Sequence, residues 1–310
     1  MPQLIRPLAL LAMTAVLSAC ASSGSAPVSP GVAAAMSSGH DSRRPAPSGY
    51  TTSKQIRYSF TVQNQSGQVL PKADFWVYAP VPQTSHQWVE RITASQAYRA
   101  SHDALGNEVL HFEFDNLPPY GTKIVTISAD LKMAPVAATT TASDVTRFLQ
   151  PEPYIESNDS RLVDLAKGLR KESHASSARA AYHWVAGNLQ SETYVLDDRG
   201  AAYALSSRKG DCTEFSYLLT ALGRANGIPA RPIGGYVFAG NAVVNATDFH
   251  NWTELYVDGR WQIADAQKRA YEQDQTSYVA MRIIASGVGG PLGNSHRYNY
   301  AGRGLEVRMN

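Results

Sequence analysis

The sequence predicts an α+β protein in which an all-β part precedes a part built from helices and a β-hairpin. From residue 50 to about residue 133, apolar and polar side chains alternate with a period of two, which is typical of half-buried strands. Beyond the linker at 133–144, apolar residues recur at intervals of three and four, which is typical of amphipathic helices. A length of 310 residues accommodates two such domains.

The all-β prediction for residues 50–135 depends on three alternating stretches separated by turn signals such as the Leu-Gly-Asn at 105–107. The apolar positions are Ile56, Tyr58, Phe60 and Val62 in the first stretch, Leu110, Phe112 and Phe114 in the second, and Ile127, Ala129 and Leu131 in the third. Short alternating strands with frequent turns favour an antiparallel β-sandwich of immunoglobulin-like size.

The second part, at 150–275, begins with two predicted helices. The first follows Asn158 or Asp159, either of which is a good N-cap, and the second runs from about residue 176 to residue 189. We expect the segment at 196–210 to be a loop, and residues 276–310 to be a C-terminal extension.

A third predicted helix begins at the stretch RKGDCTEF, residues 208–215. Asp211 is a good N-cap, Glu214 completes a capping box, and Gly227 suits the position after the helix. Cys212 therefore falls in the first turn, where unpaired N–H groups and the helix dipole stabilise a thiolate. With a base nearby, we expect the Cys212 thiol to have a low pKa and to be an accessible nucleophile.

The base is predicted from a β-hairpin in FHNWTELYVDGRWQIAD, where Asp258-Gly259 is a strong two-residue turn signal. A two-residue loop places His250 and Asp265 on the same face, one diagonal step apart. Diagonal neighbours lie about 7–8 Å apart at the backbone, close enough for imidazole and carboxylate to hydrogen-bond. The carboxylate would fix the imidazole tautomer, and the other ring nitrogen could take the thiol proton.

Thiol, imidazole and carboxylate together are the groups that acyl transfer through a thioester requires. A buried inert cysteine and a hydrogen-bonded core histidine are each common singly, but the combination of helix-terminal cysteine, strand histidine and hairpin aspartate favours catalysis. A zinc site from the same three side chains would lack the short paired-ligand motifs of such sites. We expect no metal and no cofactor.

The run GDCTEFSYLLTALGRANGIPARPIGGYV, followed by FHNWTELYVDGRWQIADAQ, resembles the transglutaminase-like superfamily, within the wider papain-like cysteine-hydrolase fold. The resemblance covers about residues 150 to 270, and the sandwich before it resembles the domain that often precedes this module in bacterial members. It implies that Cys212 is the nucleophile, His250 the general base and acid, and Asp265 the orienting residue.

The resemblance also implies an oxyanion hole that uses the Cys212 backbone N–H. Papain-type enzymes place a glutamine six residues before the cysteine, and this position is Ser206 here. We nominate Tyr194 as the second oxyanion donor. The expected function is a cysteine protease or amidase acting on a peptide or protein of the cell envelope. The alternatives are a protein-glutamine transglutaminase with an amine acceptor, and a non-catalytic envelope binding module.

The envelope assignment comes from the first 49 residues. Residues 1–19 carry one arginine, a short apolar run and small residues, as a secretory signal does, and LSAC at 17–20 resembles the bacterial lipobox. We expect a lipid on Cys20, a flexible tether over 20–49, and, since Ala21 follows the cysteine, an outer-membrane location facing the periplasm. Cys212 is then the one remaining cysteine of two.

Partners follow from the same observations. We expect a peptide or protein substrate and attachment to the membrane through the lipid anchor. A formal charge of +2, evenly spread, does not support a nucleic-acid footprint, so no nucleic-acid partner is expected.

Overall fold

The computed structural model describes residues 37–38, 44–139, 145–293 and 297–310. The expected signal peptide, the expected lipidation site Cys20 and most of the expected tether lie outside these residues. The described residues all belong to one compact unit, 34–310. No helix within the described part is long and apolar enough to cross a membrane.

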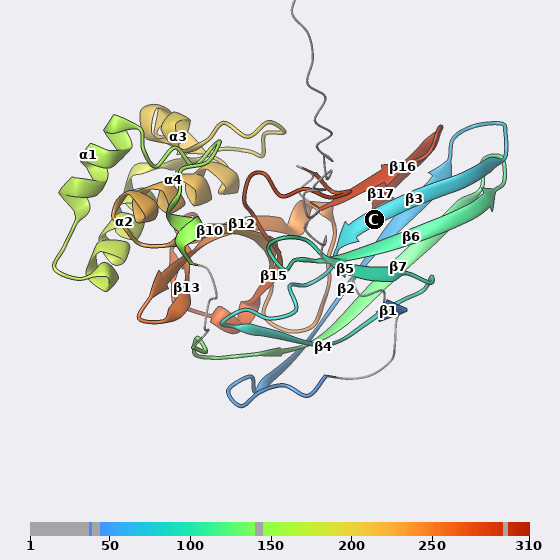
Figure 1. Cartoon of the computed structure of the whole chain (residues 1–310), viewed down its shortest axis with the longest axis horizontal. Helices are drawn as coiled ribbons and strands as arrows, with labels where there is room; N and C mark the ends of the chain where they lie inside the picture. Colours follow the sequence, from blue (N-terminus) through green and yellow to red (C-terminus); the bar gives the residue numbers. More distant parts are fainter. Residues whose placement is uncertain (1–36, 39–43, 140–144, 294–296) are drawn as a thin grey trace, which may run out of the picture. The chain divides into compact units, whose positions relative to one another are not determined.

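Residues 52–133 form strands of two sheets (Figure 1). One sheet has the order β1-β5-β6-β3-β16, and the other has the order β11-β2-β7-β4, with β17 also paired to β2. The strands are β1 (Ser37–Ser38), β2 (Thr52–Asn64), β3 (Leu70–Tyr78), β4 (Gln87–Ala94), β5 (Arg99–His102), β6 (Glu108–Leu117), β7 (Thr122–Met133), β11 (Ala242–Val243), β16 (Tyr298–Ala301) and β17 (Leu305–Met309).

Side chains from both sheets meet in one hydrophobic cluster. All ten apolar positions of the three alternating stretches in 50–135 are buried in this cluster, which confirms the strand predictions there. Alternation decides which residues enter the core because successive side chains of a strand point to opposite faces.

The segment at 276–310, expected as a C-terminal extension, is built into both halves of the fold. Its first strand, β15 (Tyr278–Ile283), pairs with β10 (Ala230–Val237) in the second part. Strands β16 and β17 then pair with β3 and β2 of the first part. Sheet edges carry unpaired N–H and C=O groups, and these late strands satisfy them.

The second part packs helices on a sheet of order β14-β13-β12-β10-β15 (Figure 1). Apolar side chains of the helices and of the sheet form a second cluster. The helices are α1 (Ser160–Leu169), α2 (His174–Asn188), α3 (Ala201–Ser207) and α4 (Cys212–Ala225), and the further strands are β12 (Phe249–Val257), β13 (Arg260–Asp265) and β14 (Ala270–Tyr271). A short parallel pair, β8 (Gln190–Ser191) with β9 (Lys209–Gly210), precedes α4.

The helix predictions were accurate in type, with one omission. Asp159 caps α1 by accepting a hydrogen bond from the Arg161 N–H, as expected. The segment at 196–210, expected as a loop, contains the short helix α3. Its two buried alanines, Ala201 and Ala204, pack in the helical cluster, so tertiary contacts stabilise a helix that has too few turns to show a period.

The β12–β13 hairpin has the predicted register, with Val257 opposite Arg260 and Tyr256 opposite Trp261. Asp258 and Gly259 both have positive φ, 52° and 75°, as a type I′ turn requires. This turn matches the twist of the strands and fixes which face each residue occupies.

Buried hydrogen bonds join the two parts of the described unit. The Gln87 amide donates to the Ala280 carbonyl at 3.0 Å and accepts from the Ala280 N–H at 2.9 Å. Asn107 makes the same two-way contact with Ile283, at 2.9 and 2.7 Å. Both side-chain amides therefore hydrogen-bond to the backbone of β15 as a neighbouring strand would. β15 is the edge strand of the sheet that contains the β12–β13 hairpin strands.

Candidate active site

Cys212 is the first residue of α4, and the predicted cap is formed. The Asp211 carboxylate accepts from the Thr213 N–H at 2.8 Å, and the Glu214 carboxylate accepts from the Asp211 N–H at 3.1 Å. At the other end, Gly227 has a φ of 77°, the left-handed conformation that glycine adopts at low cost. The sequence thus fixes both ends of the helix that carries the thiol.

The same two carboxylates connect the helix start to the preceding loop. Asp211 accepts a second hydrogen bond, from the Val195 N–H at 3.0 Å. Glu214, which is 1% exposed, pairs with the Arg199 guanidinium at 2.8 Å. The loop between β8 and α3 is therefore held against Cys212 at two points.

His250 and Asp265 form the hydrogen bond that the hairpin register predicted. The His250 Nε2 and Asp265 Oδ2 atoms lie 2.7 Å apart, and the two residues are 8% and 1% exposed. Asp265 also accepts from the Tyr278 hydroxyl at 3.1 Å and from the Lys268 N–H at 3.0 Å. A carboxylate that accepts three hydrogen bonds is held firmly in orientation.

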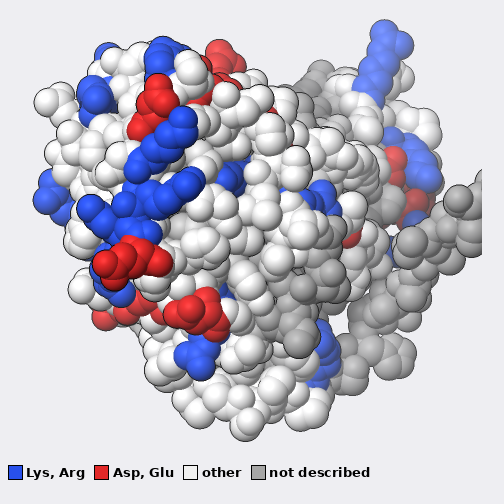
Figure 2. All heavy atoms as spheres, turned by 60° about the vertical axis from the view of Figure 1, so that its left-hand side comes forward, with Lys and Arg blue, Asp and Glu red and all other residues white. Residues whose placement is uncertain are grey.

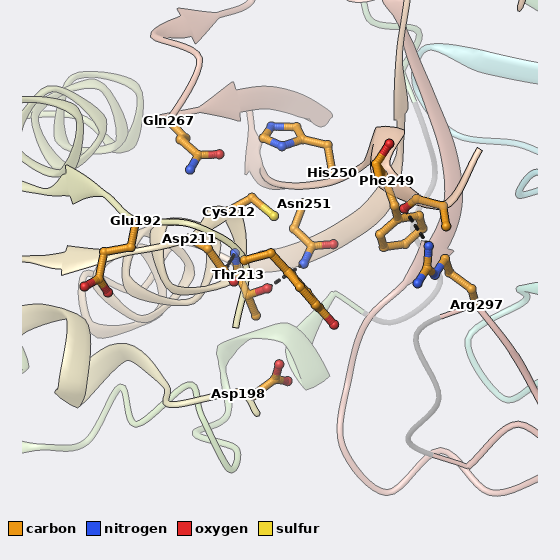
Figure 3. Close-up of a pocket in the computed structure, with 13 residues that line it drawn as sticks. Glu192, Asp198, Asp211, Cys212, Thr213, Phe249, His250, Asn251, Gln267 and Arg297 are labelled. Carbon is orange, nitrogen blue, oxygen red and sulfur yellow. Dashed lines mark hydrogen bonds between the residues drawn. The ribbon is translucent and has the colours of Figure 1, made fainter. Parts of the chain in front are cut away.

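The pairing assigns the tautomer of the histidine. Since an ionised carboxylate only accepts, Nε2 carries the proton that it donates to Asp265. Nδ1 is then left as the basic nitrogen. Figure 3 shows the His250 ring and the Cys212 side chain projecting from β12 and α4 into one space.

That space is a cleft of about 430 Å³, which Cys212 and His250 both line. Tyr194, 69% exposed, also lines it, as the prediction for a second oxyanion donor requires. Ser206 does not line the cleft, because its hydroxyl donates to the Ala202 carbonyl within α3 and accepts from Arg161. The structure thus brings Cys212, His250 and Tyr194 to one cleft, with Asp265 hydrogen-bonded to His250. Ser206, at the position of the papain-type glutamine, lies elsewhere.

Comparison with known proteins agrees with this geometry. Residues 163–266 match the family model of the transglutaminase-like superfamily. This segment is a transglutaminase-like domain. A proposed cysteine protease from Cytophaga hutchinsonii is similar in structure, with a TM-score of 0.54 and 20% identity over 84% of this chain and 92% of that one. At this identity the likeness shows the fold alone.

The periplasmic domain of TgpA from Pseudomonas aeruginosa is a more distant match, with a TM-score of 0.38 and 15% identity over 72% of this chain and 93% of that one. Among curated proteins, none matches this sequence.

The thiol of the transglutaminase-like domain differs from the expectation of a low pKa. Burial, and then the Asp211 carboxylate, raise the pKa of the half-buried Cys212 thiol to about 11. Hydrogen bonds from the Asn251 backbone and the Thr213 side chain oppose this increase, but they do not overcome it. At neutral pH, a pKa near 11 leaves roughly one thiol in 10⁴ ionised.

Sequence reasoning missed several residues of the site. Asn251 donates to the Thr213 hydroxyl at 3.0 Å and so ties β12 to the first turn of α4. Gln267 and Arg297 line the cleft, and Tyr278 supports Asp265 from β15. Asn251 and Gln267 could have been suspected, because each lies within two residues of a predicted catalytic residue. The sequence contained no signal for Tyr278 and Arg297, which belong to the C-terminal segment at 276–310.

Glu254, another carboxylate of the β12–β13 hairpin, has a structural role. It is 1% exposed and pairs with Arg231, with distances of 2.6 and 2.8 Å from one carboxylate oxygen to two guanidinium nitrogens. The Arg231 guanidinium lies 3.9 Å from the Trp261 ring centroid. Glu254 is therefore a buried structural charge.

Proposed function

We propose that this protein is a thiol acyl-transfer enzyme of the cell envelope, a cysteine protease or amidase that cleaves amide bonds of a peptide or protein. The observation that supports this most is the 2.7 Å hydrogen bond between His250 and Asp265, which leaves the His250 Nδ1 atom free to serve as a base beside a cleft that also holds Cys212. An inert cysteine would not require an oriented imidazole in the same cleft.

In the proposed reaction, the Cys212 Sγ atom attacks the carbonyl carbon of the scissile amide. The raised pKa of the thiol means that its proton moves to the His250 Nδ1 atom during the attack. His250 then gives that proton to the nitrogen of the leaving amine as the C–N bond breaks, and a thioester remains. Water attacks the thioester with His250 again acting as base, which releases the acid and restores the thiol.

The negative charge that develops on the carbonyl oxygen needs hydrogen-bond donors. The Cys212 N–H is one of the first-turn donors of α4, which have no acceptor inside their own helix. We propose the Tyr194 hydroxyl as the second donor, since Tyr194 lines the cleft. Asp265 orients the imidazole and stabilises it when it carries the proton.

Water is the proposed acyl acceptor because the cleft is open to solvent and needs no additional pocket for it. The test is to incubate the wild type and the Cys212→Ala variant with envelope peptides and a labelled primary amine, and to identify the products by mass spectrometry. Cysteine-dependent hydrolysis with little amine incorporation is the expected result. Amine incorporation that exceeds hydrolysis would instead identify a transglutaminase, and the absence of any cysteine-dependent product would favour a binding module.

We further propose that the first part of the chain is an immunoglobulin-like β-sandwich, and that a lipid on Cys20 attaches the protein to the outer membrane, facing the periplasm. In support of the first proposal, side chains from two sheets form one core.

The surface charge is mixed on the face that Figure 2 shows, where basic and acidic side chains are interspersed. This face therefore does not present an unbroken basic surface.

A further inference from the structure

Arg297 is the one lysine or arginine among the described residues that line the cleft. It lies directly before β16, the strand that pairs with β3 of the first part. In Figure 3, the Arg297 guanidinium lies beside Phe249, on the other side of Cys212 from Glu192. The first part of the chain therefore anchors one side of a cleft whose thiol and imidazole belong to the transglutaminase-like domain.

Contacts at three points hold the arginine in place. Its carbonyl accepts from the Tyr78 N–H at 3.0 Å. Its Nη1 atom donates to the Ala246 carbonyl at 2.6 Å, and its guanidinium carbon lies 5.5 Å from the Phe249 ring centroid. An arginine held in this way loses little conformational entropy when it binds a ligand.

The charge of Arg297 has no acidic partner within the described residues, where its contacts are the Ala246 carbonyl and the Phe249 ring. The nearby Asp248 accepts from the Asn245 N–H at 2.9 Å and caps a 3₁₀ turn. Within the part of the chain that the structure describes, one of the five N–H donors of the guanidinium meets a protein acceptor, which leaves the others for a ligand in the cleft.

The carboxylates of the cleft differ from Arg297 in this respect, because each is engaged by protein groups. Glu192 pairs with Lys209 at 2.7 Å and with Arg199 at 3.1 Å. Asp211 accepts two backbone hydrogen bonds, and Asp198 accepts from the Tyr217 hydroxyl at 2.7 Å. The cleft thus offers a cation without an acidic partner among the described residues at one side, and carboxylates that protein donors already engage at the other.

We propose that Arg297 is a specificity-determining residue that binds a carboxylate of the substrate, two of its N–H groups donating to the two oxygens. Arginine suits this role because its planar fork matches a carboxylate in two-point contact. A peptide offers such a group at its C-terminus or on an aspartate or glutamate side chain. This inference deepens the proposed function and rests on it, since it assigns the class of substrate that reaches Cys212.

The test uses chloroacetyl-oligoglycine peptides of increasing length, each made as the C-terminal acid and as the amide. The chloroacetyl group alkylates Cys212, and the glycine spacer places the carboxylate at a graded distance from sulfur. At one spacer length we expect the acid to alkylate about tenfold faster than the amide, which corresponds to about 1.4 kcal/mol. A parallel series ending in glutamate with an amidated C-terminus distinguishes a side-chain carboxylate from a terminal one.

The Arg297→Gln variant should lower the ratio of acid to amide rates to about one. Arg297→Lys, which keeps the charge but loses the fork, should retain part of the preference. Arg303→Gln, at the exposed turn between β16 and β17, is the matched control and should leave the ratio at its wild-type value. Circular dichroism shows whether each variant is folded.

Binding of the same peptides without a chloroacetyl group to the Cys212→Ala variant, measured by calorimetry, gives a second readout that needs no reaction at sulfur. Tighter binding of the acid that is lost with Arg297→Gln supports the inference even if the wild type hydrolyses no peptide. Equal acid and amide behaviour at every length in the wild type, or a preference that survives Arg297→Gln, would overturn it whether or not hydrolysis is found.

Discussion

His250 and Asp265 are hydrogen-bonded at the open end of the β12–β13 hairpin, beyond its last pair Thr253–Ala264, with 2.7 Å between Nε2 and Oδ2. Asp265→Asn should reduce turnover by up to about 10⁴-fold, the loss that the wrong imidazole tautomer causes in a Ser-His-Asp triad. An amide can still hydrogen-bond, but it does not stabilise an imidazolium. Steady-state kinetics beside Cys212→Ala, which should show no turnover, measures the difference.

Two variants accompany this measurement. Tyr278→Phe removes one of the three donors to Asp265 and should cost less than Asp265→Asn, while Asp258→Asn in the hairpin turn is a matched control that should keep full activity. If Asp265→Asn loses its circular-dichroism spectrum together with its activity, Asp265 is a structural residue and the orienting role is wrong.

The thiol itself gives a second prediction. Because burial and Asp211 raise the pKa of Cys212 to about 11, iodoacetamide labelling of the folded protein should rise at a pH well above the value of about 8.5 for free cysteine. Asp211→Asn should lower this pKa, since asparagine still caps the helix but carries no charge. Labelling with a midpoint below 8.5 that moves upward in His250→Ala would instead reveal a resting thiolate–imidazolium pair.

The hairpin and the cap of α4 could be predicted because short-range rules determine them. A two-residue Asp-Gly turn sets the register of β12 and β13, and this register places His250 and Asp265 on one face of the hairpin. Asp211 and Glu214 define the start of α4 for the same reason, and Cys212 follows from them.

The parts that sequence reasoning missed depend on contacts between distant segments. Tyr278 reaches the site from β15, and Arg297 from the position directly before β16, and the pairing partners of both strands lie far away in the chain. The pKa of Cys212 was expected in the wrong direction, because the helix terminus is local information whereas the burial of the thiol is a property of the folded structure.

The proposed anchor gives a third prediction. Cys20→Ser should release the protein from the membrane fraction, because lipid attachment to the cysteine would be lost, and the several acyl chains implied by the lipobox resemblance hold a protein more stably than one chain does. Cys212→Ser is the matched control and should remain with the membrane. Immunoblotting of membrane and soluble fractions measures the distribution, and a Cys20→Ser protein that still sediments with membranes would contradict the anchor.

A fourth prediction concerns stability and pH at Glu272. Burial raises the pKa of this carboxyl to about 7 from an ordinary value of 4.5, although the hydrogen bond from the Ile263 N–H opposes the increase. Between these two values the folded state binds more protons than the unfolded state, so stability falls as pH rises. The stabilisation is fully present below pH 4.5 and is lost as pH rises through about 7.

Glu272→Gln should remove this loss, since glutamine does not ionise. Relative to the variant, the wild type should lose up to about 3 kcal/mol of unfolding free energy between pH 4.5 and pH 8, from 1.36 kcal/mol for each unit of pKa shift. Urea denaturation of both proteins at several pH values measures it. The neighbouring His86, whose pKa burial lowers, gives a pH dependence of opposite sign. Its Nε2 atom lies 3.8 Å from Glu272, so the comparison includes any coupling between the two groups. Parallel stability curves for the two proteins would mean that Glu272 ionises normally in the folded state.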